Sequence, residues 1–79
     1  MKYELMVRRY SQWTFSAFGA TLRTTLECST DEQATHAAAF WVLDGVEVIV
    51  RTEDGLTQYR SISGKPFVKT DFKPVVLTP

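Results

Sequence analysis

The stretch Ser29–Gly45, STDEQATHAAAFWVLDG, decides the fold, because it has the signals of a helix. Thr30 is a good N-cap, since its hydroxyl oxygen can accept a hydrogen bond from a free amide of the first turn. Gln33 would complete a capping box with Thr30, while Ser29 and Glu32 form the alternative pair. We favour Thr30, because acidic residues then fall in the first turn, where the helix dipole stabilises negative charge.

The same stretch has an apolar stripe at helical spacing, which gives the helix one face to bury. The stripe consists of Ala34, Ala37, Ala38 and Trp41. Its alanines allow close approach to a sheet, and Trp41 fills the space where the helix diverges. Asp44-Gly45 ends the pattern, because glycine readily takes the left-handed conformation that follows many helices. The prediction is one helix over residues 30–43, stabilised by docking on a sheet.

Three strands are predicted before the helix, over residues 3–8, 13–18 and 20–28. The third alternates most clearly, with an inward side formed by Leu22, Thr24, Leu26 and Cys28. Gly19-Ala20 suits a two-residue turn between the second and third strands, and this is the favoured interpretation. The alternative is a β-bulge at Gly19 within one long bent strand.

Two more strands are predicted after the helix, over residues 46–51 and 56–63, joined by a turn in which Gly55 takes a positive φ. The tail of about residues 65–79 is apolar but rich in proline, so we expect an extended segment with residues 75–77 as a short edge strand. The fold class is therefore α+β. It is a mainly antiparallel sheet in the order β-β-β-α-β-β, with one helix packed on one face.

Composition indicates one small globular domain over residues 1–79, since 44% of the chain is hydrophobic. The formal net charge is zero, so no general attraction to nucleic acid or membranes is expected. The single cysteine excludes an internal disulfide, which fits a reducing, cytoplasmic location. We find no signal peptide and no stretch of about 18 apolar residues that could span a membrane. A homo-oligomer is compatible with this composition.

No group of residues indicates catalysis. His36 is the only histidine, and a metal site would need further ligands of suitable type. Cys28 precedes the helix cap, where thiols can become reactive, but its place in the alternation makes it a small inward-facing apolar residue. No Ser-His-Asp order, phosphate-binding glycine loop or cysteine pair is present. We expect no enzyme, no metal and no cofactor.

The face of the sheet away from the helix is also predicted to carry large side chains. They are Met6, Tyr10, Phe18, Ile49 and Tyr59. An apolar patch on that face needs a cover or a partner. Either the tail covers it through Phe67, Phe72 and residues 75–77, or the patch docks another protein.

Two groups of residues are candidates for binding a partner. The first group lies at the first turn of the chain and comprises Arg8, Arg9, Tyr10 and Trp13, residue types that often dominate interface energies. The second group belongs to the acidic middle of the chain and comprises Glu47, Glu53 and Asp54. These acids suit a basic partner such as a nucleic-acid enzyme. The alternative for them is an ordinary solvated surface.

Three strands followed by a Thr-Asp-Glu-Gln-Ala helix, with Trp13 opening the second strand, resemble AP2-type and integrase arm-binding domains over residues 3–41. In those families the three-stranded sheet enters the major groove, so the resemblance implies a small sheet-based DNA-binding domain. Their sheets carry many basic residues, whereas Arg23 is the only one on the second and third predicted strands. Phosphate contacts supply most non-specific DNA affinity, so the neutral charge disfavours nucleic acid.

The favoured hypothesis is a non-enzymatic protein-binding module with a protein partner. A short reading frame with its own start methionine resembles, in size and type, small phage or mobile-element accessory proteins. Such proteins bind and inhibit a host nucleic-acid machine, for example an RNA polymerase or a CRISPR effector. The alternative function is the DNA-binding domain described above.

Overall fold

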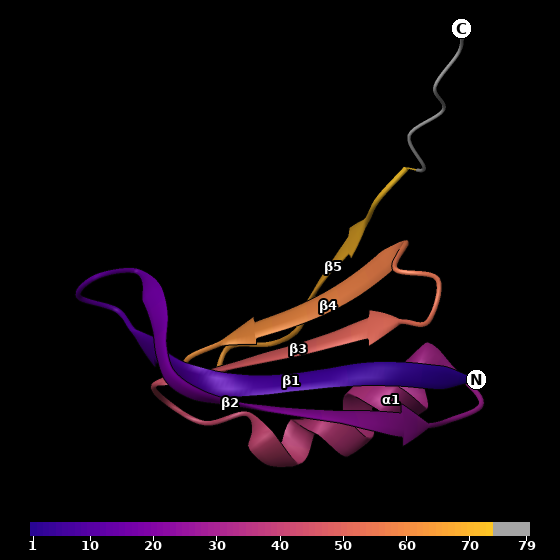
Figure 1. The fold of residues 1–79 in the computed structure, drawn as a ribbon, viewed down its shortest axis with the longest axis horizontal. Helices are drawn as coiled ribbons and strands as arrows, with labels where there is room; N and C mark the ends of the chain where they lie inside the picture. The colour runs from indigo at the N-terminus through magenta and orange to yellow at the C-terminus, as the bar shows by residue number, and fades with distance from the viewer. Residues whose placement is uncertain (74–79) are drawn as a thin grey trace, which may run out of the picture.

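The computed structural model, which describes residues 1–73, contains a five-stranded antiparallel sheet in the order β2-β1-β3-β4-β5 (Figure 1). The strands are β1 (Lys2–Ser11), β2 (Ser16–Glu27), β3 (Val46–Thr52), β4 (Thr57–Ile62) and β5 (Val68–Asp71). The helix α1 (Asp31–Ala38) lies between β2 and β3 in the chain and packs on one face of the sheet. The predicted α+β class with a mainly antiparallel sheet is confirmed.

Within residues 1–73, two strands precede the helix and three follow it, whereas three before and two after were predicted. The segments that were predicted as second and third strands belong mainly to the single strand β2, and Trp13 lies in the turn before it. Three strands before a helix are therefore absent. The arrangement on which the resemblance to AP2-type domains depends is not found in this chain.

Gly19 explains why β2 is continuous. Its φ of 80° is positive, and the register with β1 shifts between Val7, opposite Leu22, and Arg9, opposite Phe18. More residues of β2 than of β1 lie between these two pairs, which is the mark of a bulge. The favoured turn at Gly19-Ala20 is therefore wrong, and the bulge in a long bent strand is correct.

The beginning of α1 follows the prediction. The hydroxyl of Thr30 accepts from the amide of Gln33 at 3.2 Å, which confirms Thr30 as the N-cap. The side chain of Gln33 reaches back to the amide of Ser29, at 2.9 Å, instead of that of Thr30.

The end of α1 differs from the prediction, because the helix stops at Ala38 and continues as a short 3₁₀ turn, Ala39–Trp41. Such tightening is common where the last carbonyls lose their partners. Val42 is already extended, so the prediction of a helix to residue 43 is wrong. Gly45 does have a positive φ, 73°, but in the turn that leads into β3.

The core lies between α1 and the sheet. Ala34 and Ala38 are fully buried and Trp41 packs partly buried against the same cluster, as predicted, whereas Ala37 is exposed. The sheet contributes Tyr3, Leu5, Val7, Val48 and Val50. Cys28 packs against this cluster and is free, in line with its expected structural role.

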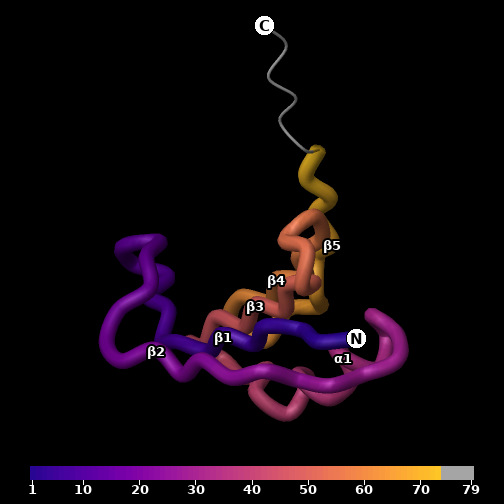
Figure 2. Tube along the Cα trace, turned by 45° about the vertical axis from the view of Figure 1, so that its right-hand side comes forward, coloured from indigo at the N-terminus to yellow at the C-terminus, as the bar shows by residue number. Residues whose placement is uncertain are grey.

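The opposite face, called the open face below, is not covered by the helix. Met6 and Ile49 are buried there, at 7% and 6% exposure. Tyr59 was predicted on this face but lies on the helix side, since it pairs with Val50 and its hydroxyl reaches Asp31. Figure 2 shows the β1–β2 hairpin tip and β4–β5 rising on the side away from α1, so the open face is concave.

The C-terminal part of the described chain extends the sheet. β5 pairs with β4, so β4 is not the edge strand. Phe67 packs against the helix-side cluster, and Val68 and Phe72 are exposed at 66% and 46%. Phe67 therefore does not cover the open face, contrary to the alternative in which the tail covers it. Residues 75–77 of that alternative, with the edge strand predicted there, lie outside the described residues.

Candidate binding groove

A groove of about 570 Å³ lies on the open face between the β1–β2 hairpin and the β4–β5 side of the sheet. Its lining residues on the hairpin are Tyr10, Gln12 and Phe15, and those on the other side are Arg60, Ile62, Ser63, Lys65, Pro66, Val68 and Thr70. The volume falls in the range of small-molecule and peptide side-chain sites. The lining of the groove is mainly apolar, and the groove follows from the concave sheet.

Backbone bonds hold both walls of the groove. On the hairpin side, the amide of Tyr10 donates to the carbonyl of Gly45 at 2.8 Å. On the other side, the amide of Ser63 donates to the carbonyl of Val46 at 2.9 Å, and the hydroxyl of Ser61 donates to the carbonyl of Lys65 at 2.7 Å. The walls are thus anchored to the segment that enters β3, which fixes the shape of the groove.

Two residues of the lining have an unfavourable backbone conformation. Phe15 and Ser63 each have a φ of 52°, and they are the non-glycine residues with positive φ in the described chain. A bulky residue in this region is strained, and such strain concentrates at functional sites. The Ser63 hydroxyl is also buried without a hydrogen-bond partner among residues 1–73.

The hairpin tip beside the groove exposes large aromatic rings. Trp13 is 93% exposed and Phe15 is 79% exposed. Tryptophan and other aromatic rings are enriched among the residues that dominate binding energies. The tip therefore has the composition of a contact surface, and it continues directly into the groove through Phe15.

The groove lining contains two cations, Arg60 and Lys65, and no carboxylate. Arg60 also donates from Nε to Glu47, at 2.7 Å. Arg8 donates to the other oxygen of the same carboxylate. Burial opposes ionisation of Glu47, but the hydrogen bonds from Arg8 and Arg60 outweigh it and lower the pKa of Glu47.

Glu47 was predicted as a partner-binding residue, and the structure places it inside the fold. Its exposure is 1%, because it lies between Arg8 of β1 and Arg60 of β4 on the open face. No local sequence signal shows this arrangement, since it requires knowing which strands flank β3. Glu47 is therefore unavailable to a partner, and the prediction for it is wrong.

On the helix face, Asp31 has a comparable role. It accepts hydrogen bonds from the hydroxyls of Tyr3, at 2.6 Å, and Tyr59, at 2.7 Å. The hydrogen bond from Tyr3, followed by that from Tyr59, lowers the pKa of Asp31. The same bonds raise the pKa values of Tyr3 and Tyr59 to about 12. Asp31 thus ties the start of α1 to β1 and β4.

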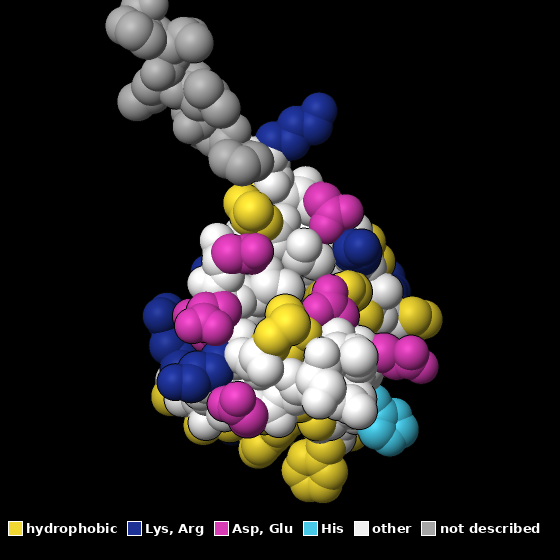
Figure 3. All heavy atoms as spheres, turned by 90° about the vertical axis from the view of Figure 1, so that its right-hand side faces the viewer, with side chains coloured by type: hydrophobic (Ala, Val, Ile, Leu, Met, Phe, Trp, Pro, Cys, Tyr) yellow, Lys and Arg dark blue, Asp and Glu magenta, His cyan; other side chains and the backbone are white. Residues whose placement is uncertain are grey.

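The acidic residues do not form one patch. Asp54 organises the β3–β4 turn, since its Oδ1 accepts from the Thr52 hydroxyl at 2.7 Å and from the Leu56 amide at 2.9 Å. The hydrogen bond from Thr52 contributes most to the lowered pKa of Asp54. Figure 3 shows the acidic side chains at this end separated by other atoms. Glu53 is exposed at the turn, and its role in binding stays a prediction.

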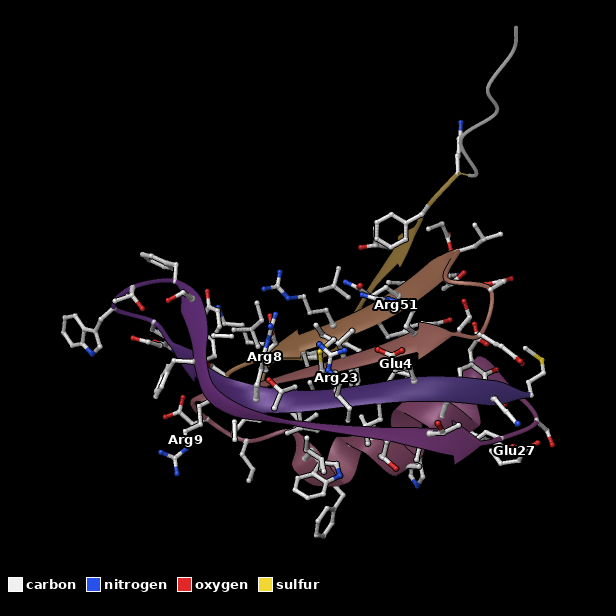
Figure 4. All side chains as sticks on the ribbon, viewed as in Figure 1. Glu4, Arg8, Arg9, Arg23, Glu27 and Arg51 are labelled. Carbon is white, nitrogen blue, oxygen red and sulfur yellow. The ribbon has the colours of Figure 1, made fainter. Side chains whose placement is uncertain are left out.

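The other predicted group is only partly brought together. Tyr10 lines the groove and Trp13 lies at the adjacent tip. Arg8 is held by Glu47, and Arg9 is exposed at the base of the hairpin, apart from Arg8, Arg23 and Arg51 in Figure 4. The sequence indicated the hairpin but missed Phe15 as a groove residue, because it was assigned to a strand.

Comparison with protein-family models, with curated proteins and with solved structures finds no match to this chain. Within residues 1–73, no cluster of three or more His, Cys, Asp or Glu side chains is placed to hold a metal ion. His36 is exposed on α1. Over the same described range, no helix has the length and apolar character needed to cross a bilayer.

Proposed function

We propose that this protein is a non-enzymatic binding module that docks a partner protein through the hairpin tip and the adjacent groove. The observation that carries the proposal is the position of Phe15. Its ring is 79% exposed, its backbone is strained, and it joins the tip of Trp13 to the groove lining. Burial of such rings is a main source of interface energy.

The lining defines the chemistry of the partner. Its apolar side chains would accept an apolar partner residue, and Lys65 with the free edge of Arg60 would attract a neighbouring carboxylate. We therefore propose an acidic, apolar surface segment as the ligand. That the partner is a host nucleic-acid machine, and that binding inhibits it, stay predictions of the sequence.

Partner capture by the tagged protein tests this proposal. The variants Trp13→Ala and Phe15→Ala should each lose the captured protein, because they remove rings from the contact surface. Phe40→Ala is the matched control, since Phe40 is an equally exposed aromatic ring, at 80%, outside the groove. Equal loss for Phe40→Ala, or no loss for Phe15→Ala, would contradict the proposal.

Charge is tested with a second matched pair of variants. Lys65→Glu places a carboxylate in the groove and should abolish capture of an acidic partner. Lys69→Glu makes the same change on β5 at a side chain that does not line the groove. Capture should persist with Lys69→Glu, and a partner lost equally from both variants would be bound by general charge only.

A second candidate function is nucleic-acid binding by the open face. Arginines of four strands share this face, namely Arg8, Arg23, Arg51 and Arg60. Glu47 neutralises part of this charge. Of these four arginines, Arg23 and Arg51 have no acidic partner within residues 1–73. A salt-sensitive shift of duplex DNA that Arg23→Glu and Arg51→Glu both weaken would support it. The absence of a shift at low salt would exclude it.

A further inference from the structure

The outer edge of β2 offers backbone groups for pairing with another strand. β2 is the first strand of the sheet order and pairs on one side with β1. The amide of Cys28 donates to the carbonyl of Met1 at 3.0 Å, and the register is regular from Glu27 to Leu22. Because hydrogen-bonded pairs alternate in antiparallel sheets, the residues that direct their amides and carbonyls outward are Arg23, Thr25 and Glu27.

This edge is accessible. The residues from 20 to 25 are all exposed, and α1 packs closer to β3 than to β2. Natural edge strands usually carry lysine, proline or a bulge against unwanted pairing. β2 has no lysine or proline, and its bulge at Gly19 lies toward the hairpin, outside the regular part. An accessible, regular edge of this kind can take up a strand.

We propose that a second copy of this chain pairs antiparallel along this edge, with Thr25 on the two-fold axis. In this register Arg23 lies opposite Glu27 of the second copy, on the open face, and the contact occurs twice. A two-fold axis at Arg23 would instead place two arginines opposite each other, which is unfavourable. Charge complementarity therefore selects the register centred on Thr25.

The groups needed for this contact are free within the described chain. Arg23 has no ion pair or side-chain hydrogen bond among residues 1–73, and Glu27 has a single loose ion pair, 3.8 Å from the N-terminal ammonium. In Figure 4, Arg23 lies over β1 and Glu27 lies beside the end of β2. The symmetric contact is self-complementary, as a two-fold interface requires. It leaves the hairpin tip and groove outside the interface, so the inference is independent of the proposed function.

Sedimentation equilibrium of the full chain tests the dimer through a charge swap. The wild-type protein should approach twice its mass of 9.0 kDa as concentration rises. Arg23→Glu and Glu27→Arg should each weaken self-association at least about tenfold, because each places like charges opposite one another twice. The double variant restores both pairs and should restore the dimer. Circular dichroism checks that each variant is folded.

A disulfide test fixes the register. Residues directly opposite in a hydrogen-bonded pair have Cα atoms about 5.5 Å apart, within the range of a disulfide. In a Cys28→Ser background, Thr25→Cys should therefore form a covalent dimer on oxidation. Thr21→Cys, also exposed on β2, is the control, because Thr21 lies opposite Ser29 in this register. Three results would overturn the proposal: a wild-type protein that is monomeric at millimolar concentration, self-association that neither Arg23→Glu nor Glu27→Arg weakens, or equal cross-linking of Thr25→Cys and Thr21→Cys.

Discussion

At the middle of the sheet, two carboxylates join β1 to β4 across β3, one on each face. On the helix face, Asp31 accepts from Tyr3 and Tyr59. On the open face, Glu47 accepts from two arginines of the same two strands. Each carboxylate therefore has a donor for both oxygens. These bonds explain how a chain with a small core holds α1 and three strands in one arrangement.

The groove is different, because its groups are not satisfied by the fold. The Ser63 hydroxyl is buried without a partner in the described chain, and Phe15 and Ser63 have strained φ angles. Trp13 and Phe15 are exposed. An unpaired buried hydroxyl and backbone strain both lower stability, so they are expected where binding compensates. The comparison teaches that the paired groups at the middle of the sheet stabilise the fold, whereas the groove contains strained and exposed groups, as the proposed binding function would require.

The largest effect is expected for Glu47→Ala, which leaves Arg8 and Arg60 facing each other without a carboxylate. Breaking a fully buried ion pair costs about 3–5 kcal/mol, and partial exposure of both arginines reduces this to about 2–3 kcal/mol. Urea denaturation measures the free energy of unfolding. Glu53→Ala, at an exposed acid of the next turn, is the control and should leave the midpoint unchanged. Equal effects would mean that Glu47 is not a structural residue.

Asp31→Asn should lower the free energy of unfolding less, by about 1 kcal/mol. The amide oxygen still accepts from one tyrosine hydroxyl, the NH2 group faces the other hydroxyl, which can turn to accept, and the charge assistance of both bonds is lost. The pH dependence follows from the lowered pKa values of Asp31 and Glu47. The unfolded chain takes up protons at higher pH than the folded one, so stability is lost as pH falls below about 5. Thermal melts from neutral to acidic pH should show a shallower loss for Asp31→Asn than for wild type. If the melting temperature of Asp31→Asn depends on pH as that of the wild type does, Asp31 does not contribute to the loss of stability at acidic pH.

Tyr3 and Tyr59 should determine how the stability of the fold changes at alkaline pH. Their pKa values are raised to about 12, above the usual value of about 10 in an unfolded chain. Stability is therefore retained below about pH 10 and lost as pH rises through 12. Tyr59→Phe should reduce this alkaline loss in melts recorded against wild type. Tyr10→Phe, which has no bond to Asp31, should keep the wild-type slope, and an identical change in both variants would contradict the assignment.

The sequence predicted the fold class because its strongest signals are local. The Thr30 cap, the buried pair Ala34 and Ala38, and the β3–β4 turn at Gly55 depend on neighbouring residues only, and the structure confirms them. Gly19 could not be assigned in the same way. Glycine suits a tight turn and a bulge equally well, and cross-strand pairing with β1 decides between them.

The groove could be predicted only in part, because its walls are distant in the chain. Tyr10 and Trp13 were recognised from residue type, but Ser63 and Lys65 come from the loop after β4. Their meeting with the hairpin depends on the curvature of the sheet, which no local pattern encodes. The prediction that Glu47 binds a partner was wrong for a related reason. Whether an acidic residue on a strand is solvated or buried depends on its neighbours on the flanking strands.

The smallest change in the free energy of unfolding is expected for Phe15→Gly. This variant is also the sharpest test of the contrast between the middle of the sheet and the groove. Relief of a positive φ contributes about 1 kcal/mol, while the extra backbone freedom of glycine in the unfolded chain offsets about half of it. Phe15→Gly should thus raise the free energy of unfolding by about 0.5 kcal/mol and still abolish partner capture. Ser63→Gly is the second case, since it relieves the same strain and removes the unpaired hydroxyl. A loss of stability with Phe15→Gly would mean that this ring supports the fold, and the groove would then resemble the middle of the sheet.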